Sequence, residues 1–492
     1  MTAIAQPSNI GGAIRRAAQS HPDRDALIAA DIRLSYDKLW QVCRVFAVRM
    51  NDAGIGRSTR VHLLSRDAIV SVAVMAATSL LGARFEIFSG AAQPSGNDDV
   101  ILYSPDQVAP KVGRSILISP EWSPRFSQVG EEVEQGFAGY GAASDPWWTL
   151  YTSGTTGTPK ALLLTHQMAF DRSIAVRSDF QGAKTRFTSL FPCNTRPFFV
   201  RAMAALVNGA TIVDTFESRF MAQEGVNLVA GAHKQVQDWA AANPDQTRFS
   251  TLQVSGAKVT ADIAAKYLER FDIVEDVYGS GETNKSFVTR YTATKNGIDC
   301  VGVPQDSTVE IVDDDGGLCG VGEIGTVRIS NGYMTDGYVD APDATAKSFR
   351  DGWFYPGDLA RWTTDGALDI LGRVDHVLNL GGAKVDPLEI EAALTEGAGV
   401  RKAAVFADPA SAPASRIVAL LELFPGHDAD RTIRDATDHC RSKLGPVRTP
   451  ESVLVVPEIP VTLDGTPMRR DCAKLFKSLF PKPSLNEKDK TC

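Results

Sequence analysis

The first 165 residues alternate between two hydrophobic patterns. Short apolar runs predict strands, and longer runs with apolar residues every three or four positions predict helices between them. The expected helices cover residues 10–18, 36–50 and 68–81. The expected strands cover residues 26–29, 32–34, 60–64, 100–103, 115–118, 147–151 and 161–164. This alternation predicts a largely parallel sheet flanked by helices.

The same pattern continues through the rest of the chain. Further helices are expected at residues 166–176 and 204–207, and further strands at 210–213, 252–255, 273–277, 310–312 and 325–329. Beyond residue 375 the order changes to helix 390–394, strands 403–407 and 417–423, and helix 432–444. This indicates a second, smaller α+β domain. Residues 481–492 are polar and are expected to be a disordered tail.

Composition narrows the class of protein. A chain of 492 residues exceeds the size of a single core, so at least two domains are expected. A formal charge of −8 argues against a nucleic-acid surface, and no apolar run reaches the roughly 20 residues of a membrane span. Seven cysteines without a Cys-x-x-Cys pair, and no secretory signal, predict reduced thiols and a cytoplasmic protein.

A run of glycines and hydroxyl residues lies between the predicted strands 147–151 and 161–164. Backbone N–H groups of such a turn can converge on an anion, the hydroxyls add donors, and a lysine adds a charge suited to phosphate. The run differs from a Walker loop, because no Lys-Ser/Thr pair follows Gly157. It predicts a phosphate site rather than a flexible surface loop, with these residues: Thr152, Ser153, Gly154, Thr155, Thr156, Gly157 and Lys160.

This run closely resembles the phosphate loop of the adenylate-forming superfamily, which includes acyl- and aryl-CoA synthetases, luciferases and the adenylation domains of peptide synthetases. The resemblance implies an α/β fold with a large N-terminal domain, residues 1–374, of two helix-flanked, mostly parallel sheets plus a small β-barrel. It also implies a small, mobile α+β domain over residues 375–480. ATP and Mg²⁺ are the implied nucleotide and metal ion.

Two further stretches resemble the family's adenine-binding elements. Ser255 and Gly256 end a predicted strand and resemble the strand and turn that lie along the adenine. The next stretch is Tyr278-Gly279-Ser280-Gly281-Glu282. By resemblance, Tyr278 stacks on adenine and Glu282 helps to hold Mg²⁺, roles that suit an aromatic ring and a hard oxygen ligand.

The ribose and hinge motifs follow. Asp358, at the end of a Gly-containing turn, resembles the aspartate that accepts hydrogen bonds from both ribose hydroxyls. Arg373 resembles the arginine that contacts ribose and phosphate, and Asp375 resembles the pivot of the mobile domain. Gly381 and Gly382 resemble the pair that borders the tunnel of the acceptor thiol, where a side chain would obstruct passage.

Two positions depart from the family pattern at the phosphoryl group. Gly281 stands where relatives carry a threonine, which leaves Ser280 as the neighbouring hydroxyl. Thr466 stands where relatives carry the lysine that bridges the acid and the α-phosphate. Loss of one preorganised donor to a developing oxyanion costs roughly 3–4 kcal/mol, or about 10²–10³ in rate.

The acid pocket departs as well. Thr195 and Phe198 occupy the places of a histidine and a glycine that border the acyl pocket in many relatives. Arg196 and Arg201 lie in the same stretch and could pair with an anionic group of the substrate. The alternative is that both arginines are exposed side chains near a helix start.

Three hypotheses follow. In the first, the protein is a ligase that uses ATP and Mg²⁺ to adenylate a small, first of all aromatic, carboxylic acid and transfers it to CoA or a carrier-protein thiol. Its expected catalytic residues are Lys160, Glu282, Thr466 and Arg196. In the second, a non-carboxylate acid such as nitrite is activated for attack by an amine. In the third, the protein binds a nucleotide but has lost catalysis.

Overall fold

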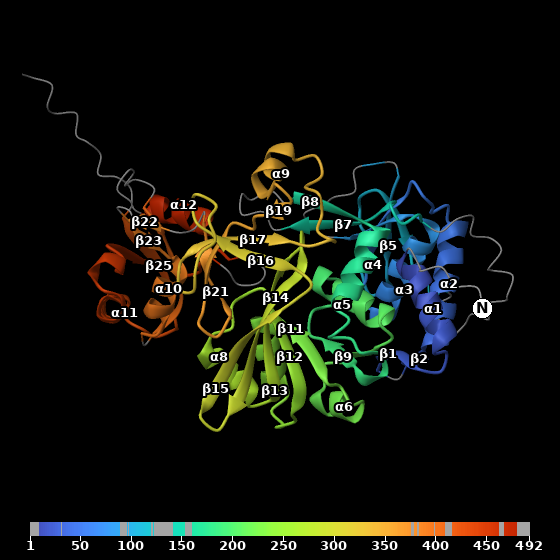
Figure 1. Ribbon diagram of the computed structural model, residues 1–492, viewed down its shortest axis with the longest axis horizontal. Helices are drawn as coiled ribbons and strands as arrows, with labels where there is room; N and C mark the ends of the chain where they lie inside the picture. The colour runs from blue at the N-terminus through green and yellow to red at the C-terminus, as the bar shows by residue number, and fades with distance from the viewer. Residues whose placement is uncertain are drawn as a thin grey trace, which may run out of the picture.

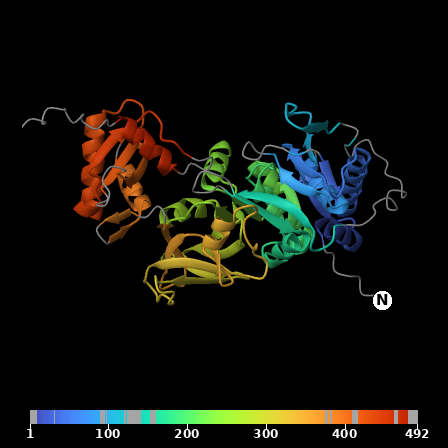
Figure 2. The same ribbon diagram turned by 90° about the horizontal axis from the view of Figure 1, so that it is seen from above.

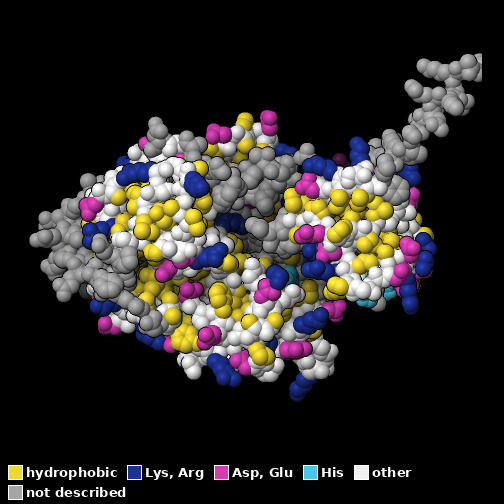
Figure 3. Space-filling view, turned by 180° about the vertical axis from the view of Figure 1, so that it is seen from behind, with side chains coloured by type: hydrophobic (Ala, Val, Ile, Leu, Met, Phe, Trp, Pro, Cys, Tyr) yellow, Lys and Arg dark blue, Asp and Glu magenta, His cyan; other side chains and the backbone are white. Residues whose placement is uncertain are grey.

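The computed structural model describes residues 9–30, 32–88, 96, 98–119, 122, 141–152, 160–374, 378–380, 383–397, 399–408, 416–461 and 467–479. A main part, residues 9–374, contains three sheets, and a smaller C-terminal region, residues 378–479, stands at one end of the long axis (Figure 1). The view from above shows the same separation (Figure 2). A hollow lies between the two parts, and Lys and Arg side chains lie along it (Figure 3).

The first sheet has nine strands in the order β15-β14-β13-β12-β11-β9-β10-β1-β2. Its central pairs are parallel, and antiparallel pairs close both edges. The strands are β1 (Asp25–Ala29), β2 (Ile32–Ser35), β9 (Arg186–Ser189), β10 (Thr211–Asp214), β11 (Leu228–Gly231), β12 (Phe249–Ser255), β13 (Phe271–Ser280), β14 (Asn284–Thr294) and β15 (Gly297–Pro304).

The second sheet has six strands in the order β6-β5-β3-β4-β7-β8. All neighbours are parallel except β7 and β8, which form an antiparallel pair. The strands are β3 (Arg60–Leu64), β4 (Arg84–Ile87), β5 (Asp99–Tyr103), β6 (Arg114–Leu117), β7 (Pro146–Thr152) and β8 (Lys160–Thr165).

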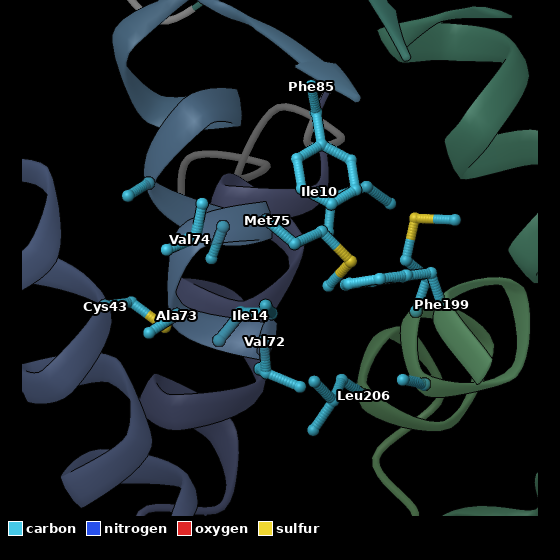
Figure 4. Close-up of a cluster of buried hydrophobic side chains, with 14 of the residues drawn as sticks. Ile10, Ile14, Cys43, Val72, Ala73, Val74, Met75, Phe85, Phe199 and Leu206 are labelled. Carbon is cyan, nitrogen blue, oxygen red and sulfur yellow. The ribbon is translucent and has the colours of Figure 1, made fainter. Parts of the chain in front are cut away.

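Helices of the main part cover these sheets. They are α1 (Ile10–Ser20), α2 (Tyr36–Asp52), α3 (Ala68–Leu81), α4 (His166–Ala175), α5 (Arg196–Val207), α6 (Ser218–Gln223), α7 (His233–Ala242), α8 (Ala261–Leu268) and α9 (Pro342–Ser348). Helix α3 is apolar on all sides and is almost wholly buried, as such a helix must be. Phe199 and Leu206 of α5 pack into the same cluster as Ile10, Ile14 and the side chains of α3 (Figure 4).

The third sheet is antiparallel and has its own small core. Phe287 of β14 joins Ile311, Val327 and Ile329 in that core, which ties the sheet to the edge of the first one. It stands where the small barrel was expected. Its strands are β16 (Thr308–Val312), β17 (Gly325–Ser330), β18 (Phe349–Arg350), β19 (Trp353–Phe354), β20 (Asp358–Trp362) and β21 (Leu368–Arg373).

The C-terminal region is an α+β unit. A three-stranded sheet, β24-β25-β26, has an apolar cluster on each face. Its elements are β22 (Leu378–Leu380), β23 (Ala383–Val385), α10 (Pro387–Thr395), β24 (Val400–Ala407), β25 (Ile417–Leu423), α11 (Ala429–Leu444), β26 (Ser452–Val455) and α12 (Arg469–Leu479). The expected boundary at Asp375 and the tail 481–492 lie outside the described residues.

The expected fold class is confirmed, and so are most of the expected elements. Strand β3, helix α3 and strand β25 have the predicted bounds, and the side chains of Ser35 and Thr165 cap α2 and α4. Helix α5 was expected only at 204–207 but begins at Arg196, because Pro197 lies in its first turn, where proline is tolerated. No helix among the described residues is long and apolar enough to cross a membrane.

Candidate functional site

The two ends of the predicted phosphate loop are held together by the β7–β8 pair. Thr152 and Lys160 are register partners, and Thr152 Oγ1 donates to the Lys160 carbonyl at 3.4 Å. The intervening residues therefore connect two adjacent antiparallel strands. Of the loop's predicted residues, Ser153, Gly154, Thr155, Thr156 and Gly157 lie outside the described residues.

The segment 278–282 leaves the first sheet at the end of β13. A register shift follows Tyr278, and a Cβ atom on Gly279 would lie 2.1 Å from the Asn284 carbonyl oxygen, so only glycine fits there. Ser280 Oγ accepts the backbone N–H groups of Glu282 and Thr283 at 3.2 and 3.3 Å. The hydroxyl of Ser280 thus shapes the turn that carries Glu282.

Glu282 and Lys160 meet at a tyrosine. Glu282 is buried, and its Oε1 accepts the Tyr338 hydroxyl at 2.7 Å. Lys160 Nζ lies 4.6 Å from the centre of the Tyr338 ring. Burial, and then the neighbouring Glu282 carboxylate, raises the pKa of Tyr338. The hydroxyl therefore stays protonated and donates to Glu282.

A lone carboxylate beside a phosphate loop fits Mg²⁺, which binds through one or two carboxylates and the oxygens of a nucleotide. Glu282 is such a carboxylate, and its Oε1 has the Tyr338 hydroxyl as a partner. In the described part of the chain, no group of three or more His, Cys, Asp or Glu side chains could form a metal site by itself. The residues present are thus compatible with a metal ion held jointly by Glu282 and nucleotide phosphates.

A second carboxylate lies at the other end of the segment. Tyr278 Oη donates to Asp358 Oδ2 at 2.6 Å, and Arg373 Nη1 lies 3.4 Å from Asp358 Oδ1. Burial, and then the Asp358 charge, raises the pKa of Tyr278 well above its ordinary value. Asp358 and Arg373 are register partners on β20 and β21. Ser255 pairs with the residue that precedes Tyr278 and is followed by Gly256, so these positions lie at the same end of the adjacent strands β12 and β13.

Arg172 was not expected at the site. Its side chain is 7% exposed and donates to the backbone carbonyls of Tyr333, Gly281 and Glu282 at 2.9, 2.8 and 2.7 Å. Burial, and then the charge of Arg196, lowers the pKa of Arg172 to about 9. Arg172 therefore fixes the backbone on which Glu282 sits.

Arg196 and Arg201 lie near the start of α5, and both are half-buried. Arg201 donates to the Pro197 carbonyl and to Ser255 Oγ, and its guanidinium lies over the Phe191 ring. Burial lowers the pKa of Arg196, against the charge of Glu282, and lowers that of Arg201 to about 10. The alternative reading of exposed arginines is wrong for both.

The structure therefore brings together most of the predicted site residues that it describes. Thr466, Asp375, Gly381 and Gly382 lie outside the described residues, so their expected roles stay predictions. Sequence reasoning missed Arg172 and Tyr338. Arg172 follows Ala169 and Phe170 on the buried face of α4, and a charged residue on such a face was the available signal. The sequence carried no comparable signal for Tyr338, whose contact with Glu282 joins residues 56 positions apart.

Several known enzymes are similar to this chain in sequence. The chain is 28% identical over 347 residues to feruloyl-CoA synthase of an Amycolatopsis species, which covers 66% of this chain and 69% of that protein. It is 24% identical over 528 residues to 2-hydroxy-7-methoxy-5-methyl-1-naphthoate–CoA ligase of Streptomyces carzinostaticus, with 93% and 91% covered.

A solved structure shows the shared fold. O-succinylbenzoate coenzyme A synthetase of Bacillus subtilis, in complex with AMP, superposes with a TM-score of 0.79 at 18% identity and covers 93% of this chain and 97% of that one. The family model of AMP-binding enzymes matches residues 101–339, and the model of their C-terminal domain matches residues 389–465. The two ranges together span more than half of the chain, which therefore belongs to the AMP-binding enzymes of the adenylate-forming superfamily.

Proposed function

We propose that this protein uses ATP to adenylate a small acid and then transfers the activated group to a thiol. The observation that carries the proposal is the segment 278–282, which has Asp358 at one end and Lys160 with Tyr338 at the other. Four residue steps of extended chain reach at most about 13–14 Å. That distance suits a nucleotide with its ribose at Asp358 and its β- and γ-phosphates near Lys160.

In the first step, an oxygen of the acid attacks the α-phosphorus. The bond from that phosphorus to the bridging oxygen breaks, and pyrophosphate leaves with the electron pair. In the second step, a thiolate attacks the activated carbonyl and AMP leaves, after the thiol has lost its proton to solvent. Mg²⁺ bound at Glu282 would neutralise charge on the phosphates.

The residues of this chain bind and orient in these steps. Asp358 and Arg373 would hold the ribose, and Tyr278 would lie against the adenine with Ser255 and Gly256. Lys160, the hydroxyls of the loop and its glycines would hold the β- and γ-phosphates. Positioning of this kind can supply roughly 7–11 kcal/mol of the barrier without a protein nucleophile.

The names of the relatives support an aromatic acid as the substrate and CoA as the acceptor. Feruloyl-CoA synthase and the naphthoate–CoA ligase both carry such a substrate in their names. For this chain we propose a small carboxylic acid as the substrate, and an aromatic acid is the preferred candidate. CoA is the first acceptor to test, and a carrier-protein thiol the second.

One observation favours a second candidate. Burial, and in part the charge of Arg196, lowers the pKa of both Arg172 and Arg201, so three guanidinium groups lie near one another, and the Glu282 charge acts on Arg172 and Arg196. Such a basic environment also suits an acid with little apolar bulk, such as nitrite. Nitrite oxygen would then attack the α-phosphorus, and an amine would attack the nitrogen of the resulting mixed anhydride and displace AMP.

Pyrophosphate release with ATP and Mg²⁺ tests both candidates. The protein is incubated with each member of a panel of small aromatic and aliphatic acids plus nitrite, with and without CoA or an arylamine. Release that depends on one acid identifies the activated group, and the acceptor that accelerates it identifies the second step. ATP binding without release from any combination would instead support a catalytically silent nucleotide-binding protein.

A further inference from the structure

Gly281 matters because it has no side chain, and not because glycine can adopt a left-handed backbone conformation. Its φ angle lies outside the left-handed region, so other residues could adopt this backbone. A Cβ atom at position 281 would lie 3.1 Å from Arg196 Nη1, 3.1 Å from Leu162 Cδ1 and 3.3 Å from Thr152 Cγ2. A threonine, the residue that the family resemblance implies here, would add two further atoms beyond that Cβ. The glycine thus leaves room for Arg196.

Ser280, the nearest hydroxyl in the described part of this turn, does not replace the missing threonine. Ser280 Oγ already accepts two backbone N–H groups and lies 3.2 Å from Thr283 Oγ1. Its hydroxyl is therefore used within the turn. The guanidinium of Arg196 is the donor group that lies where the side chain of residue 281 would begin.

Arg196 differs from its two neighbouring arginines. Arg172 donates to three carbonyls, and Arg201 donates to a carbonyl and a serine hydroxyl. Among the described residues, Arg196 has no hydrogen-bond or ion-pair partner, although the Glu282 charge acts on it. A half-buried guanidinium in this state keeps its N–H donors available for an oxyanion.

The position of Arg196 is fixed by the core. It is the first residue of α5, and Phe199, one turn later, is fully buried against Phe85 and Trp148. Leu206 anchors the other end of the helix in the same cluster (Figure 4). The helix start, and with it the base of the Arg196 side chain, is thereby held beside the end of the phosphate loop.

We propose that Arg196 is a catalytic residue that binds the reacting oxyanion of the acid next to the α-phosphate. It takes the place of the threonine missing at 281 and of the lysine missing at 466. The inference rests on the proposed adenylation and deepens it. A planar guanidinium pairs in bidentate fashion with a compact, planar oxyanion, so the substrate class is a carboxylate or nitrite presented edge-on to Arg196.

The test compares Arg196→Ala, Arg196→Lys, Gly281→Thr and the double variant Arg196→Ala/Gly281→Thr with the native chain. The exposed Arg219 on α6 provides a matched control, Arg219→Ala. Initial rates of pyrophosphate release are measured against acid concentration, and the Kd for ATP is measured separately. The ATP measurement distinguishes a damaged nucleotide site from a damaged acid site.

Arg196→Ala should lower the acid-dependent rate about 10²–10³-fold, because one preorganised donor to an oxyanion is lost. The Kd for ATP should stay within about threefold. Arg196→Lys should recover part of the loss, since a point charge remains without the bidentate geometry. Gly281→Thr should be impaired when Arg196 is present, and the double variant should be more active than Arg196→Ala alone. Arg219→Ala should match the native chain.

Undiminished pyrophosphate release by Arg196→Ala would overturn the proposal, as would an equal loss of ATP affinity and of rate. If the native chain binds ATP but releases no pyrophosphate with any acid, the adenylation proposal fails first. Arg196 is then tested by the binding of benzoate and of nitrite to protein saturated with α,β-methylene-ATP. At least about tenfold weaker binding of one probe in Arg196→Ala would sustain the anion site, whereas unchanged binding of both would refute it.

Discussion

The nucleotide end and the acid end of the site are organised in opposite ways. At the proposed nucleotide end, Asp358 already has two partners, the Tyr278 hydroxyl from the first sheet and Arg373 from the neighbouring strand β21. At the acid end, the central cation, Arg196, has no hydrogen-bond partner among the described residues, and a glycine lies against it. One end therefore carries the residues that the family resemblance implies, and at the other we propose that Arg196 has replaced them.

This difference indicates which functional groups the family motifs identify and which they do not. Under the proposed function, groups that hold ribose and the outer phosphates would perform the same task for every acid. Groups next to the α-phosphorus would meet the acid itself. There, we propose that the glycine at position 281 and the approach of Arg196 form one coupled change, because a Cβ atom at 281 would lie only 3.1 Å from Arg196 Nη1.

The largest effect is expected for Arg172, which holds the backbone of the segment between the two ends of the site. Arg172→Ala should lower the free energy of unfolding of the main part by about 3 kcal/mol or more, since three buried carbonyls lose their donor and each unsatisfied group costs roughly 1–3 kcal/mol. Denaturant midpoints measured by tryptophan fluorescence check this. A shift no larger than that of Arg219→Ala would mean that these carbonyls do not depend on Arg172.

The next largest effect tests the proposed role of Asp358 in binding the ribose. Asp358→Ala should weaken ATP binding about 10–100-fold, because hydrogen bonds to a charged group contribute roughly 1.5–3 kcal/mol. The dissociation constants of ATP and of an analogue with a 2′,3′-dideoxyribose are compared by calorimetry. The native chain should discriminate between them and Asp358→Ala should not. Equal discrimination by both would remove Asp358 from the ribose site.

A smaller effect tests whether Arg196 fills the role that the family resemblance gives to a lysine at position 466. In the native chain, Thr466→Lys should change the pyrophosphate rate by less than about threefold, because Arg196 already supplies the donor. In the Arg196→Ala background the same substitution should restore about tenfold or more of the 10²–10³ lost. A large gain in the native background would instead mean that Arg196 does not fill this role.

The smallest effect concerns a single hydroxyl. Tyr278→Phe keeps the ring but removes the donor to Asp358 Oδ2, so ATP affinity should change by about threefold or less. Tyr278→Ala also removes the stacking surface and should cost about tenfold, a loss in the range reported for base–aromatic stacking. If both variants bind ATP like the native chain, Tyr278 does not contact the nucleotide.

Much of the fold could be predicted from the sequence, because apolar runs bounded by turn residues specify where strands and helices lie. Helix α3 is the clearest case, with its apolar run closed by Gly82 in a left-handed conformation. The surroundings of Gly281 could not be predicted in this way. Arg196, Leu162 and Thr152 meet it from three separate elements. Because the hydrophobic pattern predicts the start of α5 eight residues too late, this contact could not be inferred from it.

The motifs also could not show how Ser280 is used. Its hydroxyl looks available in the sequence, yet the turn into β14 directs two backbone N–H groups at it. Only the backbone path makes this clear. The same holds for Tyr338, which reaches Glu282 from the loop before α9.

The central claim is that a retained nucleotide site serves a rebuilt acid site. The most direct measurement is the initial rate of acid-dependent pyrophosphate release by the native chain and by Arg196→Ala, at saturating ATP and Mg²⁺. The account predicts a rate that rises with one acid in the native chain and falls about 10²–10³-fold in the variant, with ATP affinity retained. Equal rates in the two proteins would contradict it.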